Sequence, residues 1–330
     1  MSHFDKLKYF FRLLTFLGIL PVWNINKREV QTSKRCKLYS LMMLILVTTI
    51  YISLLISRVF YIFPMRKSTI ISVDTVNYLI QYVLNVVSIC QINYFATKKL
   101  EKILNVLHFK DKKLVRHQYF VIIFNHLLIF FLIFYDCYIW LIEHEISIAE
   151  QVLYLQYFQK YHVQMVVLLL YVLIGAIEVK YRSFNIFLLN CLSKFNVKER
   201  TTLFSKVSRE RDQDFRNVSI YCDLRNMFEL YSEIGDLLET FNDVFGWIIF
   251  LIIINLFTDI LSSLNFVIIE FGAIKKANID DVHNMVIIIL STFLGVVSRF
   301  SNTFCTITFS SNLNYSGFWS DACQVIRRRR

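Results

Sequence analysis

The sequence feature that most constrains the fold is a set of apolar runs as long as a lipid bilayer is thick. The run over residues 241–269 reads FNDVFGWIIFLIIINLFTDILSSLNFVII. A helix crosses the hydrocarbon core with about 20 mainly apolar residues. The whole chain is 56% hydrophobic with a mean hydropathy of +0.49, whereas a soluble domain is about 45–50% apolar. Since the excess is concentrated in such runs, the sequence predicts an integral membrane protein.

Six apolar runs predict six membrane-spanning helices and an all-α, polytopic membrane helical bundle. The predicted spans cover residues 38–60, 70–95, 119–142, 162–179, 244–269 and 282–300. Residues 180–243 are charged but keep apolar residues at helical spacing, which predicts long cytoplasmic extensions of the fourth and fifth spans. No Gly-rich or Pro-rich linker divides the chain, so residues 1–300 are predicted to form one transmembrane domain followed by a polar, basic tail over 301–330.

The N-terminal segment MSHFDKLKYFFRLLTFLGILPVW has an apolar part that ends at Pro21. A signal peptide would need a small-residue cleavage site after the apolar part, and none follows. An amphipathic helix lying in the membrane interface is therefore the favoured interpretation.

Lysine and arginine alternate in density between the predicted spans. They are concentrated before the first span and in the second and fourth connections, and they are sparse in the first, third and fifth. Basic residues mark the cytoplasmic side of a membrane protein, so the sequence predicts a multi-pass membrane protein with a cytoplasmic N-terminus. A G-protein-coupled receptor has the opposite orientation. The net charge of +11 is explained by loops that face anionic lipid, so we expect no nucleic-acid partner.

Three segments resemble the insect gustatory receptor family, the chemosensory relatives of insect odorant receptors. They are FRLLTFLGILP at 11–21, YRSFNIFLLNCL at 181–192 and ETFNDVFGWIIFLIIINLF at 239–257. The resemblance implies a taste receptor for small-molecule tastants. It further implies a subunit of a ligand-gated cation channel that assembles as a homo- or hetero-tetramer with related receptor subunits.

The chain departs from the family pattern near its C-terminus. The family has a seventh span with a Thr-Tyr-five residues-Gln motif, and that span lines the ion pathway. After Phe300 the chain has neither the motif nor an apolar stretch of spanning length. The alternative interpretation is therefore a truncated, non-conducting membrane protein that at most assembles with full-length relatives. A G-protein-coupled-type receptor or a carrier is a less favoured alternative.

Polar and aromatic residues in the outer halves of four spans are the candidate ligand-binding residues, because small-molecule pockets combine apolar walls with a few polar groups. They are Tyr78, Gln81, Tyr135, Asp136, Trp140, Tyr161, Gln164 and Asp259. Structural roles compete at each position, since Tyr and Trp also favour membrane interfaces and polar side chains also join helices. Asp136 and Asp259 are the best candidates because a buried carboxylate must be paired, hydrated or protonated.

No motif indicates an enzyme or a cofactor. The chain has no phosphate-binding glycine loop, zinc-protease motif or nucleophile elbow. Its seven cysteines lack the spacing of a metal site. His126 lies alone within the third predicted span, so we expect it to pack or to bond to its own helix rather than to bind metal.

Overall fold

The computed structural model describes residues 4–21, 23–24, 29–30, 34–62, 68–107, 112–143, 155–201 and 211–274. The elements in chain order are α1 (Phe4–Phe16), β1 (Trp23–Asn24), β2 (Glu29–Val30), α2 (Lys34–Ser57), η1 (Arg58–Ile62), α3 (Ser68–Cys90), η3 (Gln91–Phe95), α4 (Thr97–Val106), α5 (Lys112–Glu143), α7 (Leu155–Thr201) and α8 (Arg211–Ile274). Apart from one two-residue antiparallel pairing of β1 with β2, these elements are helices. The predicted all-α membrane helical bundle is confirmed.

Four of the described helices are long and apolar enough to cross a membrane: Lys34–Phe60, Thr75–Phe95, Leu155–Leu189 and Arg225–Ser262. They fall on the first, second, fourth and fifth predicted spans. Helix α5 covers the third predicted span, and His117–Phe131 is a shorter apolar segment within it. The predicted span over 282–300 and the tail over 301–330 lie outside the described residues.

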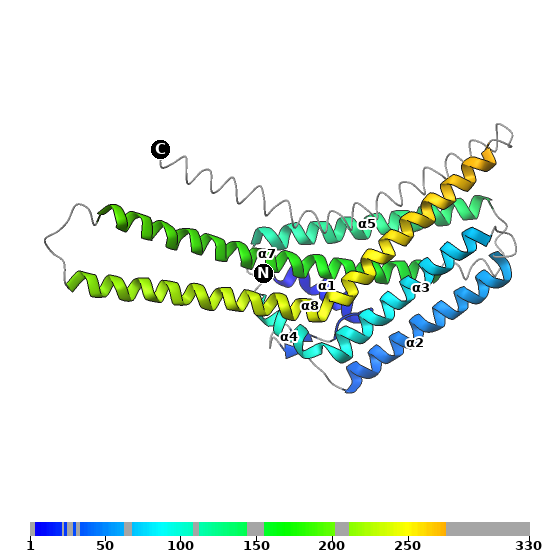
Figure 1. Cartoon of the computed structure of the whole chain (residues 1–330). Coiled ribbons are helices and arrows are strands. Elements are labelled where there is room, and N and C mark those ends of the chain that lie inside the picture. The colour runs from blue at the N-terminus through cyan, green and yellow to red at the C-terminus, as the bar shows by residue number, and fades with distance from the viewer. Residues whose placement is uncertain are drawn as a thin grey trace.

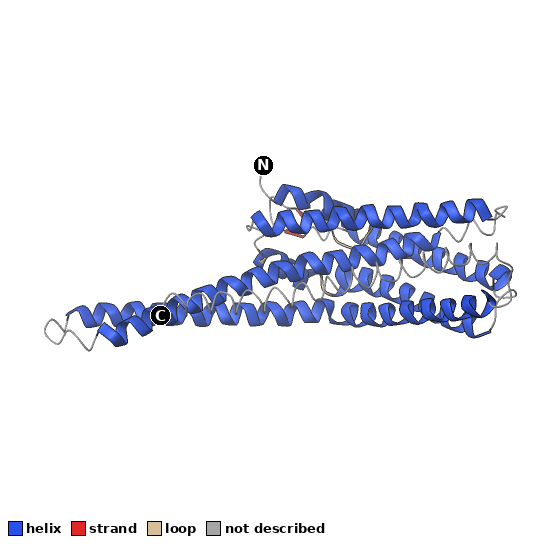
Figure 2. Ribbon diagram, turned by 90° about the horizontal axis from the view of Figure 1, so that it is seen from above, coloured by secondary structure: helices blue, strands red, loops and turns tan. Residues whose placement is uncertain are grey.

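Helices α7 and α8 continue side by side well beyond the bundle, as Figures 1 and 2 show. The two extensions contact each other through the Lys180 ammonium, which lies 2.5 Å from a Glu233 carboxylate oxygen, and through the rings of Phe184 and Tyr231, whose centroids are 6.0 Å apart. Over the described residues 180–201 and 211–243, the helical periodicity therefore does correspond to two long helices. A pair of helices can bury only one stripe on each, so Phe228 remains exposed.

The N-terminal helix α1 is amphipathic, as predicted, but its apolar face packs against protein. Leu7, Phe10 and Leu14 are buried in the main core cluster together with residues of α3, α7 and α8. The same pattern of apolar residues suits a lipid interface and a protein groove equally, so the sequence alone did not distinguish them.

A turn at Gly18 ends this segment and is held by side chains of two other helices. Gly18 has a φ of 70°, a left-handed conformation that L-residues with a Cβ rarely adopt. The side-chain amide of Asn93 donates to the carbonyl oxygens of Gly18 at 2.9 Å and Ile19 at 3.3 Å. On the other side, Nε2 of His162 lies 3.2 Å from the carbonyl oxygen of Leu17.

Candidate functional site

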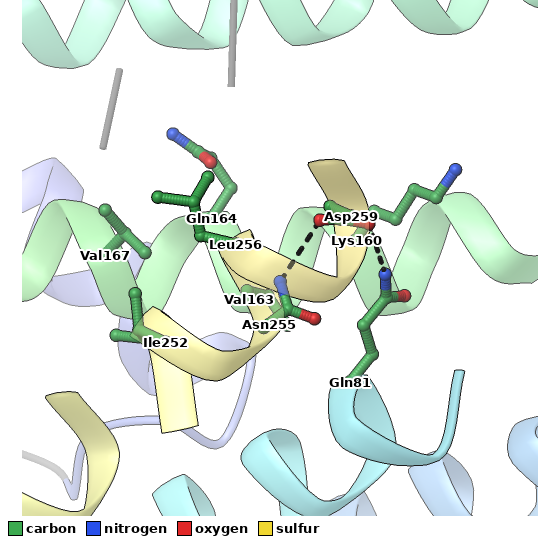
Figure 3. Close-up of a pocket in the computed structure, with 9 residues that line it drawn as sticks. All are labelled: Gln81, Lys160, Val163, Gln164, Val167, Ile252, Asn255, Leu256 and Asp259. Atoms are coloured by element: carbon green, nitrogen blue, oxygen red, sulfur yellow. Dashed lines mark hydrogen bonds between the residues drawn. The ribbon is translucent and has the colours of Figure 1, made fainter. Parts of the chain in front are cut away.

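A small cavity lies between α3, α7 and α8, and Figure 3 shows its lining. It encloses about 50 Å³. The lining residues are Gln81 of α3, Lys160, Val163, Gln164 and Val167 of α7, and Ile252, Asn255, Leu256 and Asp259 of α8. Apolar and polar side chains are thus mixed in the lining, as they are in ligand pockets.

Asp259 is the centre of the polar lining and is only 8% exposed. Its Oδ1 accepts hydrogen bonds from the amide of Asn77 at 2.8 Å and from the amide of Gln81 at 3.4 Å. Its Oδ2 accepts from the amide of Asn255 at 3.3 Å. The amides of Asn77 and Gln81 therefore join α3 to α8 through one carboxylate, and the amide of Asn255 holds that carboxylate from its own helix.

The carboxylate also fixes which way the surrounding amides face. The amides of Asn77, Gln81 and Asn255 each donate an N–H to a carboxylate oxygen of Asp259, so each turns its NH₂ group toward it. The oxygen of Asn77 accepts in turn from the hydroxyl of Thr258 at 3.2 Å. The amide oxygens of Gln81 and Asn255 are buried and have no hydrogen-bond partner in the described part of the chain.

Helix α7 contributes two polar side chains to the cavity. The Lys160 ammonium lies 5.5 Å from the centroid of the Tyr157 ring, within cation–π range. The amide of Gln164 donates to Oδ1 of Asn125 at 3.4 Å, which connects the cavity lining to α5.

A buried histidine lies next to the cavity on α7. His162 is fully buried, and its Nδ1 lies 2.8 Å from Oδ1 of Asn85 on α3. Its Nε2 faces the carbonyl oxygen of Leu17, as described above. Asn85 is four residues from Gln81 and therefore one helical turn away, so the end of the N-terminal segment contacts a histidine whose other partner lies one turn from the cavity lining.

The candidate residues from the sequence separate into three groups. Gln81, Gln164 and Asp259 line the cavity. Tyr78 instead stacks on Tyr51, with centroids 5.3 Å apart, and Tyr161 packs edge-on to His126 at 5.9 Å, so these two tyrosines face other helices. Tyr135, Asp136 and Trp140 lie on α5, with side chains outside the described set.

His126 bonds to its own helix, as predicted, because its Nδ1 lies 2.7 Å from the carbonyl oxygen of Ile122. Among the described residues no group of acidic, His or Cys side chains has the arrangement of a metal site.

Lys160 and Asn255 in the lining and Asn77 behind it are not among the residues predicted from the sequence. For Asn77 and Asn255 the sequence did contain a signal. Asn77 and Gln81 are four residues apart on α3, and Asn255 and Asp259 are four residues apart on α8. Residues at this spacing lie on one face of a helix, and a polar face on an apolar span indicates a buried contact or a functional site.

The size of the cavity determines what it can bind in this conformation. One water molecule needs about 10–15 Å³ of the space that is open to water centres. The cavity offers about 50 Å³ of this space, so it has room for a few waters. Pockets for drug-sized ligands measure about 300–1,000 Å³. A ligand of that size can therefore be accommodated fully between α3, α7 and α8 only if these helices move apart.

Comparison with known proteins gives a match to a family model. The model of a family described as "7tm Chemosensory receptor" matches residues 7–317. No curated protein and no solved structure matches the chain significantly.

Proposed function

The chain belongs to the 7tm chemosensory receptor family, and from that premise we propose that it is a gustatory receptor that detects small-molecule tastants and gates a cation pathway. Family membership and the membrane-spanning helices make it a multi-pass membrane chemoreceptor. The proposal that the chain binds tastants rests on the cavity between α3, α7 and α8. There a buried carboxylate and four other polar side chains meet within the membrane-spanning part.

Gating follows from the difference between the closed and the expanded cavity. A ligand shifts a conformational equilibrium only by its differential affinity for the two states. A tastant larger than a few waters binds the expanded state alone, so its binding energy favours separation of α3 from α7 and α8. In the proposed channel this separation opens the ion path among subunits.

The proposed subunit is one transmembrane domain over residues 1–300 in a homo- or hetero-tetramer with related receptors, in the plasma membrane. Its N-terminus is proposed to be cytoplasmic. Supporting this, the start of α2 lies against η3, since the Tyr94 hydroxyl of η3 donates to the carbonyl oxygen of Lys37 at 2.7 Å. Basic residues of α2 and of α4, which follows η3, are exposed at this end, among them Lys34, Arg35, Lys98 and Lys102, as expected of a cytoplasmic side.

Patch-clamp recording of the expressed chain, with and without full-length relatives, tests the proposal. Val163→Trp fills the cavity and is expected to abolish tastant-evoked currents while surface expression persists. Val76→Trp is the matched control, because Val76 is half exposed on the outer face of α3. A tastant response that survives Val163→Trp would contradict the assignment of the cavity.

The second candidate is the non-conducting subunit. Under this alternative, currents appear only when a full-length relative is present. Saturable uptake of a substrate without currents would instead indicate a carrier.

A further inference from the structure

The polar groups around the cavity are unbalanced between donors and acceptors. The three amides next to Asp259 all use their N–H groups on oxygen acceptors. Two of their oxygens, Oε1 of Gln81 and Oδ1 of Asn255, find no donor among the described residues, although these residues are 4% and 8% exposed. Buried acceptors without a partner are uncommon, and each carries a desolvation cost.

Reversing the amides does not remove the imbalance. If the amide of Gln81 or Asn255 were turned over, its oxygen would face the Asp259 carboxylate at 3.4 or 3.3 Å, the distances now spanned by the N–H donors. Two acceptors at that distance repel each other. Asp259 therefore orients both amides through their N–H groups and leaves both oxygens for some other donor (Figure 3).

We infer that the cavity selects ligands that carry polar hydrogens, either hydroxyl groups or a primary ammonium group, and that these hydrogens bond to the amide oxygens of Gln81 and Asn255. The inference rests on the proposed function, because it names the ligand class of the same cavity. Asp259 acts here as a positioning residue, since it sets the orientation of the two amides that contact the ligand.

The inference also explains how such a ligand favours the expanded cavity. Both oxygens are enclosed in the closed conformation, so a donor reaches them only when α3 and α8 separate. The hydrogen bonds then form in the expanded state alone, which is the differential affinity that gating requires. A ligand with acceptors only forms no hydrogen bond to these two oxygens.

An anionic ligand is the competing possibility, because Lys160 lines the same cavity. An anion bound there would face the carboxylate of Asp259 and the two unpartnered amide oxygens. These repulsions favour donors over anions, and the comparison is open to a direct test.

The test measures thermal unfolding of the purified full chain in lipid nanodiscs with pairs of small probes. Glycerol is compared with its trimethyl ether, and methylammonium with tetramethylammonium, so that each pair differs in polar hydrogens. Acetate is the anionic probe. Since a ligand that binds the folded state raises the midpoint by mass action, the dose that gives half the rise measures affinity.

Gln81→Met and Gln118→Met form a matched pair of variants. Both residues have a buried amide oxygen without a described partner, but Gln118 lies on α5 and away from the cavity lining. Glycerol also stabilises proteins by exclusion from their surface, and that effect is the same in both variants. We expect Gln81→Met to raise the half-effect dose of the donor probes about tenfold and Gln118→Met to leave it unchanged.

The two donor probes distinguish the two sources of polar hydrogens. A response to glycerol alone assigns a polyhydroxyl ligand, and a response to methylammonium alone assigns an ammonium ligand. The inference is overturned if the methylated probes or acetate stabilise the protein equally, if no donor probe acts, or if Gln81→Met has no effect. If a tastant without polar hydrogens evokes currents that Val163→Trp abolishes, the proposed function stands and the ligand class falls.

Discussion

Gly18→Ala is expected to destabilise the protein strongly, although it adds a single methyl group. Gly18 forms the turn after α1 with a φ of 70°. A Cβ built there would lie 2.7 Å from Cγ and 2.8 Å from Cβ of Met43 on α2. The same turn presents the carbonyl oxygens that Asn93 and His162 contact, so any shift that relieves the clash also lengthens those hydrogen bonds.

The loss in free energy of unfolding expected for Gly18→Ala has two parts, one from the backbone conformation and one from the added carbon. An L-residue in the left-handed region costs about 1–2 kcal/mol, and forcing an extra carbon into a packed site costs about 1–3 kcal/mol. Their sum is roughly 2–5 kcal/mol if they add. Gly18→Asn separates the parts, because Asn tolerates the left-handed conformation better than Ala but keeps the Cβ.

Gly235→Ala is the matched control and has the opposite expected sign. Gly235 lies in the exposed part of α8, and a Cβ added there meets nothing within 4 Å. Replacing an exposed helical glycine by alanine stabilises by about 0.5–1 kcal/mol. Thermal unfolding of both variants in the same detergent gives the comparison. The reasoning is refuted if Gly18→Ala unfolds at or above the temperature of Gly235→Ala.

Three further substitutions test the polar contacts, each by thermal unfolding against the unsubstituted chain. Asp259→Leu removes the carboxylate that accepts from three amides and should destabilise by about 1–3 kcal/mol. Its control, Asp243→Leu, removes an exposed ion pair with Lys99 and should cost less than about 1 kcal/mol; equal effects would contradict the burial argument. His162→Phe keeps a ring of similar size but leaves two oxygens without the imidazole and should cost about 1–3 kcal/mol; an unchanged midpoint would show that the imidazole contacts contribute nothing. Lys180→Met, which removes the partner of Glu233, should cost about 0.2–1 kcal/mol, and the loss should shrink in high salt; a loss independent of salt would indicate packing instead.

The bundle was predictable because a bilayer demands continuous apolar helices, and run length reports them directly. The extension of α7 and α8 was predictable for a related reason, since apolar residues repeat at helical spacing within each of them. Phe184 of α7 and Ile234 and Leu237 of α8 are members of these two stripes and are buried. Exposed residues such as Phe228 share that spacing. Periodicity therefore predicts the helix reliably but not which of its faces another helix covers.

The sequence predicts how deep in the membrane the candidate residues lie, but not toward which neighbouring helix each side chain faces. Gln81, Gln164 and Asp259 were selected because they lie in the outer halves of predicted spans, and they do meet at one cavity. Tyr78 was selected by the same reasoning. It lies three residues from Gln81 on α3, yet it stacks on Tyr51 of α2 and under the guanidinium of Arg58. The rotation of a helix about its axis is set by packing against neighbours, which hydropathy does not report.

The contacts around α1 connect the cavity to a part of the chain that ligand does not touch. His162 bonds Asn85 of α3 and faces Leu17, while Asn93 of η3 holds Gly18 and Ile19. The end of the N-terminal segment is therefore held between α3 and α7. Because His162 lies within one helical turn of the cavity lining, a ligand that separates α3 from α7 must lengthen at least one of these contacts. Coupling between two sites requires an element with two arrangements whose equilibrium both sites bias. The turn at Gly18 can serve as this element, because it is contacted both by Asn93 of η3, which continues α3, and by His162 of α7.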